Sequence, residues 1–347
     1  MIEIHDLETF ASYEADMDAL LKRSTGKNLY MTYEYVYTWL SYFDRDRFTI
    51  LLLKKGDFVV GFVLLVKKNF SRWPLFHTEG GDYADFLMDD SCREEAMRYF
   101  LDYIFSNLHS GRIEVGHLHS DSLNLPLIKE YARIHKKPIE DSITEDAPYI
   151  IPEGSFEEYA EQKLKRKSTV SDTLRCIRRL DEVGSVRYVK IADARACSRD
   201  ELMRYLDLFF EMHQKQWAKS KFRKEKKEIE RYKEFAYRAL QKGYFELALL
   251  YLDEKIIAMH YGFKLNTCRY YFTPAYDIDY KHYSPGKILL YRLIKNSFEE
   301  GVEFDFQKGK EPYKLEWTDQ VQERVVIHVY RNSIIQKFIA LRRRVAK

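Results

Sequence analysis

The sequence predicts an α/β (α+β) protein of two domains, each with a mixed, mostly antiparallel sheet flanked by helices. The chain has 347 residues, which is more than one small core needs and suits two ordinary domains. Two strand-turn-strand patterns of nearly the same shape occur, at residues 48–67 and 244–264, and each follows helical segments. This repetition indicates a weak internal duplication. We expect domains at residues 1–150 and 151–347.

The first half alternates helical and strand patterns. Residues 29–43 place apolar side chains three and four positions apart, which predicts a helix with Thr32 as its N-cap. Gly56 and Asp57 separate two apolar runs and predict a hairpin. The other expected elements are two strands around a glycine turn at 75–88, a helix at 93–108 and a strand at 112–117.

The second half restarts near residue 151. Ser155 and Glu158 have the spacing of a capping box, which marks a helix start. The expected elements that follow are helices at 156–183, 199–217, 232–241 and 285–300, and strands at 186–191, 244–252, 255–264 and 268–276.

Composition bounds the class of protein. The chain is 46% apolar and 32% charged, as soluble globular proteins are. No apolar run reaches the length of a membrane-spanning helix, and the first residues lack the layout of a signal peptide, so we expect a cytoplasmic protein. The four cysteines are far apart and form no Cys/His cluster, so neither a disulfide scaffold nor a metal site is expected.

The turn at residues 281–287 has the chemistry of an anion site. Pro285 suits the first position of the helix that follows, Ser284 suits its N-cap, and Gly286 lets the backbone approach a ligand. Unpaired N–H groups, the helix dipole, Lys281 and Lys287 together favour a phosphate or pyrophosphate. An ordinary helix start is the alternative.

Residues 284–317 carry a family likeness. A Ser-Pro-Gly helix start is followed by Gly301, a Phe-Asp-Phe strand, Gly309 and a Tyr-Lys-x-x-Trp ending. This pattern resembles the C-terminal signature of the CelD/BioF2-like acyltransferase family of the GNAT superfamily. The likeness extends to residues 32–39, 82–89, 175–184 and 213–217. It implies two GNAT-like folds in tandem, as in the related Fem peptidyltransferases, but names no substrate.

The resemblance also implies an acyl-CoA co-substrate, and no metal. In the superfamily, the pyrophosphate of acyl-CoA rests on an Arg/Gln-x-x-Gly-x-Gly/Ala turn. Lys281, Ser284 and Gly286 occupy its three defined positions here, with Lys287 beside them. Lysine still meets phosphate as a point charge, whereas Ser284 in place of glycine narrows the approach of the backbone. The first half has no equivalent turn, which suits it to the acceptor side.

Four residues are candidates for catalysis. Asp305, between two phenylalanines, is a candidate base, or else a structural partner of Lys308 or Lys314. Tyr313 could protonate the departing thiolate, and Lys314 could meet an anionic group of the acceptor. His260 alternates with apolar residues, so it is either catalytic or a wall residue of its strand. The oxyanion needs a backbone N–H, expected where the strand ends near Thr273.

The expected acceptor is a small-molecule amine, such as an amino sugar or a cell-surface polysaccharide precursor, that enters between the halves. Trp217, Tyr276, Trp317 and Asp82 are its expected contacts, and core packing is the alternative for Trp317.

Two other functions stay open. One is a Fem-like enzyme that takes its acyl group from aminoacyl-tRNA. The other is a non-enzymatic nucleic-acid binder that uses a basic helix, although a net charge of +3 does not by itself indicate such a partner. The basic residues of that helix are Lys163, Lys165, Arg166, Lys167, Arg175, Arg178 and Arg179. The basic, amphipathic segment 333–344 either contacts a membrane surface weakly or packs on the second domain.

Overall fold

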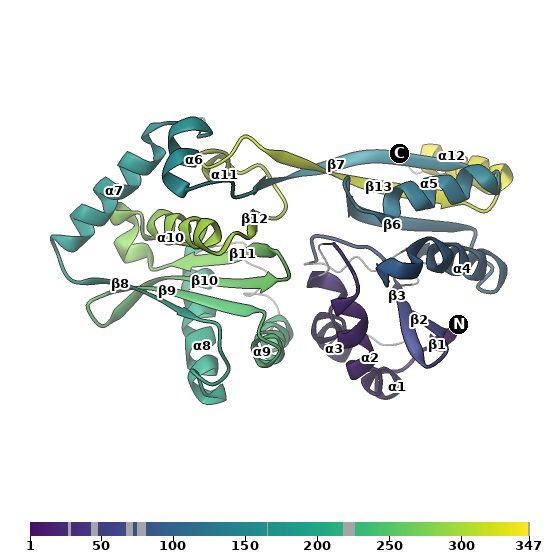
Figure 1. Ribbon diagram of the computed structural model, residues 1–347, viewed down its shortest axis with the longest axis horizontal. Helices are drawn as coiled ribbons and strands as arrows, with labels where there is room; N and C mark the ends of the chain where they lie inside the picture. The colour runs from purple at the N-terminus through teal and green to yellow at the C-terminus, as the bar shows by residue number, and fades with distance from the viewer. Residues whose placement is uncertain are drawn as a thin grey trace. The chain divides into compact units, whose positions relative to one another are not determined.

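The computed structural model describes residues 1–26, 29–42, 48–66, 72–74, 81–164, 166–217 and 226–345 (Figure 1). The chain forms two compact units: unit 1 comprises Met1–Glu145 and Gln322–Lys347, and unit 2 comprises Asp146–Val321. The chain leaves unit 1 along β7 (Ile139–Ile150) and returns along β13 (Val321–Tyr330). Residues 322–347, which the sequence prediction assigned to the second domain, therefore belong to unit 1.

Unit 1 contains two groups of strands. One sheet has the order β1-β2-β3-β5, and β4, β6, β13 and the first part of β7 follow one another in the other. The strands not yet given are β1 (Ile2–Ile4), β2 (Phe48–Lys55), β3 (Phe58–Val66), β4 (Arg72–Pro74), β5 (Leu87–Met88) and β6 (Arg112–His119). The helices are α1 (Leu7–Ala11), α2 (Glu14–Lys22), η1 (Leu29–Met31), α3 (Tyr33–Tyr42), η3 (Asp90–Cys92), α4 (Arg93–Ser106), α5 (Asn124–Ile134) and α12 (Ser333–Val345).

Helix α4 packs on the hairpin of β2 and β3 because small and large side chains fit together there. Gly61 in β3 is required, since a Cβ atom at this position would lie 2.6 Å from Phe100 Cε2 of α4. Leu51 and Val63 join Phe100 in the same buried core. On the opposite side Phe62 stacks on Phe10 of α1. Both faces of this hairpin are therefore covered, which explains its almost continuous apolar sequence.

Unit 2 has one sheet, in the order β7-β12-β11-β10-β9-β8 for the part of β7 that it contains. Its strands are β8 (Val186–Ile191), β9 (Phe245–Leu252), β10 (Lys255–Leu265), β11 (Cys268–Tyr276) and β12 (Glu303–Asp305). Its helices are α6 (Phe156–Gln162), α7 (Ser168–Asp181), α8 (Arg199–Gln216), α9 (Lys226–Gln241), η5 (Ile278–Tyr283), α10 (Pro285–Glu300) and α11 (Pro312–Leu315). Neighbouring strands are antiparallel except β11 and β12, which are parallel.

Helices cover both faces of this sheet: α6, α7 and α10 lie on one face, and α8 and α9 lie on the other (Figure 1). The α10 face is aliphatic, with Leu289, Leu293 and Ile294 buried against Ala258. The opposite face is aromatic, and Tyr261 of β10 contacts rings from both α8 and α9. The unusual aromatic content of the chain thus serves in part as ordinary core.

Most predicted elements of unit 2 and both hairpins are confirmed. The predicted helix at 156–183 is instead two helices, α6 and α7, and the helix expected at 232–241 begins earlier, at Lys226. Residues 75–80 of the expected strand pair at 75–88 lie outside the described residues, and only Leu87–Met88 is a strand in its remainder. None of the described helices has the length and apolar content needed to cross a bilayer.

Candidate active site

The start of α10 leaves a backbone donor unused. Ser284 is left-handed, with φ 55° and ψ 49°, and its side chain makes no capping hydrogen bond. The Ser284 carbonyl accepts from the N–H groups of Lys287 at 3.0 Å and Ile288 at 3.2 Å. The N–H of Gly286 has no acceptor in the described part of the chain. The serine was therefore predicted correctly as the residue before the helix, but its hydroxyl does not serve as the cap.

Tyr276 lies beside this donor. A Cβ atom at Gly286 would be 3.3 Å from Cδ1 of the Tyr276 ring, so any larger residue must displace the ring. Gly286 is only half-buried, and Lys281 before it is exposed. The site is thus bordered by the ring but not closed by it.

The other end of α10 is fixed by a buried arginine. Arg269 of β11 is fully buried and donates to Glu246 Oε2 at 2.7 Å, Ser297 Oγ at 2.8 Å and Glu300 Oε2 at 2.8 Å. Lys190 and Lys264 also bind Glu300, at 2.7 and 2.8 Å. Burial alone would raise the pKa of Glu300, but these cations outweigh it and lower the pKa to about 2. This network locks α10 to the sheet and so fixes where its first turn lies.

Strand β11 stops pairing with β12 before it reaches the start of α10. Its parallel pairing with β12 covers only Cys268–Tyr270 against Glu303–Asp305. After Asp305 the chain turns towards β7, where the Phe306 N–H donates to the Pro148 carbonyl at 3.0 Å. From Tyr271 to Tyr276 one edge of β11 has no strand partner among the described residues, although Gln216 Oε1 accepts from the Tyr276 N–H at 3.1 Å. A β-bulge opposite Tyr261 adds to the irregularity.

Cations surround the residues before α10. The ammonium of Lys281 is exposed and has no ion pair within the described residues. Helix α7 packs against η5, and its Arg179 guanidinium lies 5.7 Å from the centre of the Tyr283 ring. Arg178, next to it, is exposed and unpaired in the described chain. Residues 281–287, called the α10 turn below, therefore have cations beside them, while Asp277 and Asp279 lie at the start of η5.

Lys287 is already paired. Its Nζ atom lies 2.9 Å from Glu316 Oε2, and the same carboxylate contacts Arg166 at 3.4 Å. Of the seven basic residues predicted to form one face, Lys165 lies outside the described residues, and several others bind neighbouring carboxylates or carbonyls. These are Arg166 and Arg175 with Asp172, Lys163 with Glu153, and Lys167 with the Glu161 carbonyl. Only part of the predicted basic face is free to bind an anion.

The structure gives Asp305 and Lys314 structural contacts. Asp305 is fully buried in β12, and its Oδ1 accepts from the N–H of Gln307, a residue with φ 61°. Lys314 is 4% exposed; its Nζ donates to the carbonyls of Lys308 at 2.7 Å and Gly309 at 3.3 Å and pairs with Glu311 at 2.8 Å. Both residues hold the loop after β12 in place, and their catalytic roles stay predictions.

Tyr313 and His260 are linked through one ring. The Tyr271 ring stacks on His260 at 4.6 Å and meets the Tyr313 ring edge-on at 6.4 Å. Tyr313 is 40% exposed; burial, and secondarily the Glu311 carboxylate, raise the pKa of its phenol, so it stays protonated at neutral pH. A protonated phenol has a proton to donate, whereas its raised pKa makes it a weaker acid than an ordinary tyrosine.

His260 has the surroundings of a wall residue. It is 1% exposed, and neither ring nitrogen has a hydrogen-bond partner within the described residues. Burial, and next the charge of Arg269, lower the pKa of the imidazole to about 3. A base this weak removes a proton from an ammonium poorly. This placement fits a structural residue in the wall of the strand better than it fits a catalytic residue.

The expected acceptor contacts are dispersed. Trp217 is 51% exposed at the end of α8, whereas Trp317 is 1% exposed in the core, 6.2 Å from the Tyr291 ring. Tyr276 borders the α10 turn as described. Asp82 belongs to unit 1, where Arg324 donates to its carbonyl at 2.8 Å. Trp317 is therefore a core residue, which was the alternative interpretation, and Tyr276 is the expected acceptor contact that touches the α10 turn directly.

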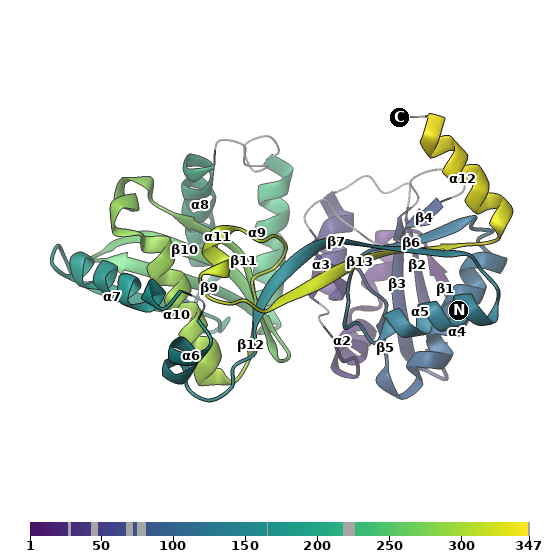
Figure 2. The same ribbon diagram turned by 90° about the horizontal axis from the view of Figure 1, so that it is seen from above.

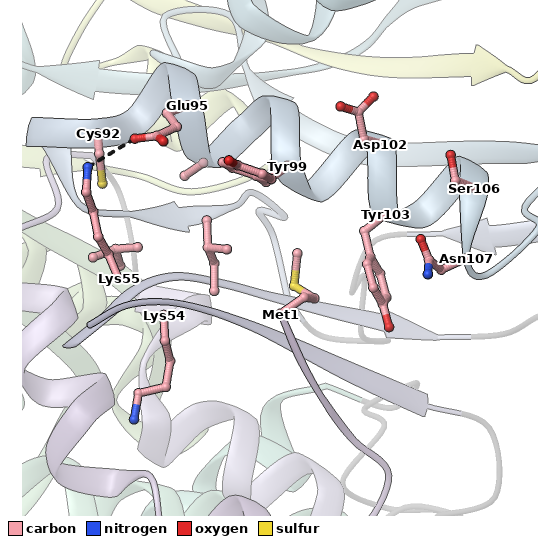
Figure 3. Close-up of a pocket in the computed structure, with 13 residues that line it drawn as sticks. Met1, Lys54, Lys55, Cys92, Glu95, Tyr99, Asp102, Tyr103, Ser106 and Asn107 are labelled. Carbon is pink, nitrogen blue, oxygen red and sulfur yellow. Dashed lines mark hydrogen bonds and ion pairs between the residues drawn. The ribbon is translucent and has the colours of Figure 1, made fainter. Parts of the chain in front are cut away.

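Unit 1 contains a cavity of a different kind. It measures about 590 Å³ and lies between α4 and the hairpin of β2 and β3 (Figure 3). Lys55 and Glu95 pair across it at 3.1 Å, and Tyr99 and Asp102 line it from α4. Since its charges include both signs, this cavity lacks the anion-binding character of the α10 turn.

Sequence reasoning missed Glu316, Gln216 and Tyr271. Glu316 sits between the tyrosine and tryptophan of the family ending, and only its long-range pairing with Lys287 reveals a role. Gln216 and Tyr271 act through backbone and ring contacts, which leave no mark in a single sequence.

Comparisons with known proteins bear on the fold and on the family of one domain. Residues 167–315 match a family model described as an acetyltransferase (GNAT) domain. No curated protein sequence matches the chain significantly. The solved structure of FemX is similar over 97% of this chain and 99% of its own, with a TM-score of 0.63 and 11% identity. L-PGS from Bacillus licheniformis is similar over 98% and 96%, with a TM-score of 0.60 and 10% identity.

A conserved protein of unknown function from Bacteroides thetaiotaomicron is also similar, over 91% of this chain and 97% of its own, with a TM-score of 0.57 and 14% identity. At such identities these structures establish the fold alone. The family model and the fold define the protein as a GNAT-type acyltransferase. Residues 167–315, within unit 2, carry the recognised GNAT domain, and the chain as a whole shares its fold with FemX.

Proposed function

We propose that the protein is an N-acyltransferase that moves an acyl group from acyl-CoA to an amine acceptor, and we expect it to act in the cytoplasm. Unit 2 would hold the donor, with the pyrophosphate of coenzyme A at the α10 turn. The observation that carries the proposal is the unused Gly286 N–H at the start of a firmly anchored helix, a few residues after the unpaired ammonium of Lys281. The resemblance of the turn to the pyrophosphate-binding turn of the superfamily supports the same assignment.

The chemistry needs few groups. The free amine attacks the thioester carbonyl, so a C–N bond forms and the C–S bond breaks, while the amine loses a proton and the thiolate gains one. We assign the thiolate proton to the Tyr313 phenol, which is protonated at neutral pH as an ordinary tyrosine is. We assign oxyanion stabilisation to the backbone N–H of Thr273, in the stretch of β11 that pairs with β10 on one edge and has no strand partner among the described residues on the other. The base that takes the amine proton is left to Asp305 or to solvent.

An aminoacyl-tRNA donor is the second candidate. The exposed guanidinium of Arg178 and the ammonium of Lys281 favour any donor that carries phosphates, including the end of a tRNA. The two donors differ in reach, since coenzyme A needs only the α10 turn, whereas a tRNA extends over more of α7. An amino sugar or a polysaccharide precursor stays our proposed acceptor.

Calorimetry with acetyl-CoA tests the donor. We expect saturable binding that weakens with added salt. Lys281→Glu should weaken it at least about tenfold, because the charge next to the phosphates reverses. Lys22→Glu, the same change at an exposed lysine of α2, is the matched control and should leave binding unchanged.

Release of free thiol in the presence of a panel of amines then tests the reaction. Acetyl-CoA binding without thiol release for any amine contradicts the enzyme proposed here. Absence of acetyl-CoA binding together with binding of aminoacyl-tRNA favours the second candidate, and salt-sensitive binding of any RNA without acyl transfer favours a nucleic-acid binder.

A further inference from the structure

Helix α12 exposes a row of large apolar side chains. Ile334 is 78% exposed, Phe338 54% and Leu341 61%. Their spacing of four and three residues places them on one side of the helix. Isolated exposed apolar residues are common on proteins, but a continuous row on one helix face marks a surface that contacts something.

The opposite side of α12 is attached to unit 1. Gln336 donates to Glu140 Oε1 at 2.9 Å, and Ile335 and Ile339 are half-buried. Asn332 Oδ1 accepts from the Ile335 N–H at 3.0 Å and thereby caps the helix start. Figure 2 shows α12 projecting from the end of β13. The orientation of the helix is thus set by contacts within the unit, and the apolar row is its outer side.

Basic residues flank the row. Lys337 is exposed and unpaired within the described residues, and the Arg342 guanidinium lies 4.8 Å from the centre of the Phe338 ring. The sequence from residue 331 to 347 contains no Asp or Glu. Near the start of the helix, Arg331 lies close enough to Lys137 that its charge, after burial, lowers the pKa of that lysine. The surface therefore suits a partner that has negative charge at its surface and an apolar interior.

We propose that α12 is a membrane-surface helix that binds anionic phospholipid bilayers, with Ile334, Phe338 and Leu341 entering the acyl boundary and Lys337 and Arg342 meeting phosphates. An interfacial helix needs one apolar row with cations beside it, and α12 offers both. A protein partner is disfavoured, because a stable interface covers roughly 800 Å² on each side, far more than three side chains supply. The proposal is independent of the acyl donor.

Sedimentation of the full chain with lipid vesicles tests it. The protein should bind vesicles of phosphatidylglycerol and phosphatidylcholine in equal amounts and bind phosphatidylcholine alone much more weakly. Phe338→Glu should weaken binding at least about tenfold, since a buried aromatic ring is lost. Lys337→Gln and Arg342→Gln should each weaken it about fivefold, as expected for one cation near an anionic surface.

Phe58→Glu is the matched control, because Phe58 is 68% exposed but lies in the β2–β3 hairpin and not on α12; its cross-strand neighbour Lys55 is paired with Glu95. It should bind vesicles as the unchanged protein does, and thermal melting should show that every variant is folded. Equal vesicle binding by the unchanged protein and the α12 variants overturns the proposal. So does a dimer, seen by light scattering, that Phe338→Glu dissociates, because the row is then covered by a second copy.

Discussion

The segments that lead into α4 and α10 treat negative charge in opposite ways. Before α4, Asp89 accepts from the Ser91 N–H at 3.0 Å, and the Arg23 side chain binds the same carboxylate at 2.5 Å. Asp90 accepts from Thr25 and pairs with Arg93. Before α10, Ser284 offers no side-chain cap, and Lys281 stands unpaired. The segment before α4 is filled by the protein's own carboxylates and the segment before α10 is left open, although neither helix has a side-chain N-cap of its own.

The difference shows how two units of one chain can use a helix start either for stability or for binding a ligand. A helix start attracts an anion because its N–H groups and dipole are positive. Unit 1 satisfies that tendency internally and gains stability, whereas unit 2 leaves it unsatisfied and gains a candidate donor site.

The largest expected effect comes from blocking the open helix start. Gly286→Trp, at the second residue of α10, should weaken acetyl-CoA binding roughly 100-fold, because the new ring covers a charge-assisted donor. Glu94→Trp, at the second residue of α4, should leave binding unchanged. Calorimetry on both variants measures the contrast, and equal losses would show that the two helix starts do not differ as described.

Substituting the residues before the two helices should affect the free energy of unfolding in the opposite order. Asp89→Ala should lower the free energy of unfolding by about 2 kcal/mol, because the buried cap and the partner of Arg23 are lost together. Ser284→Ala should cost less than about 0.5 kcal/mol, since no side-chain hydrogen bond is removed. Urea denaturation of both variants tests this, and a larger cost at Ser284 contradicts it.

The hairpins of the two units also differ at a glycine. Gly61 makes room for a phenylalanine of α4, whereas a Cβ atom at Gly262 would lie 2.1 Å from Cε1 of His260 in the same strand. The imidazole is therefore kept neutral in a tight space, with its pKa lowered to about 3. Because the folded pKa lies below the unfolded one, this group costs stability as the pH falls below about 6.5.

His260→Phe should remove that cost. Between about pH 7 and about pH 5, the unchanged protein should lose about 2 kcal/mol more of its unfolding free energy than the variant does. Denaturation curves at the two pH values measure the difference. Parallel losses in the two proteins would mean that His260 is protonated without penalty.

The smallest expected effect sharpens the role of Lys287. Glu316→Gln removes its ion-pair partner at 2.9 Å and should leave the ammonium available to phosphate. Acetyl-CoA should then bind about threefold more tightly, as expected for one partly exposed charge. Calorimetry decides it, and weaker binding would show that the pair is needed to shape the α10 turn.

The sequence allowed the hairpins, α10 and the family likeness to be predicted because each depends on local order. Phe58–Val66 is a nearly unbroken apolar run, and Pro285 marks the first residue of its helix. Strand β7 was missed because acidic residues and Pro148 interrupt its pattern, although it connects the two units. Without β7 and β13, residues 322–347 could not be assigned to the first unit.

The sequence predicted where the candidate site lies in the chain, but it did not predict the contacts that form the site. The α10 turn was expected from Pro285, Gly286 and the lysines, but the left-handed Ser284 and the pairing of Lys287 with Glu316 arise from tertiary structure. The burial of Asp305 and Lys314 also depends on the loop that folds over them. Residue type and spacing indicate which groups are chemically suitable, and packing decides which of them are free.

The chain leaves unit 1 along β7 and returns to it along β13, and this order has a consequence for synthesis on the ribosome. Strand β13 pairs with β6, yet some two hundred residues, including all of unit 2, are translated between them. Unit 2 is a continuous segment and can acquire its structure as it emerges, whereas unit 1 must wait for its last strand. The half that begins first is therefore completed last, and its β6 edge stays open to wrong partners until translation passes residue 330.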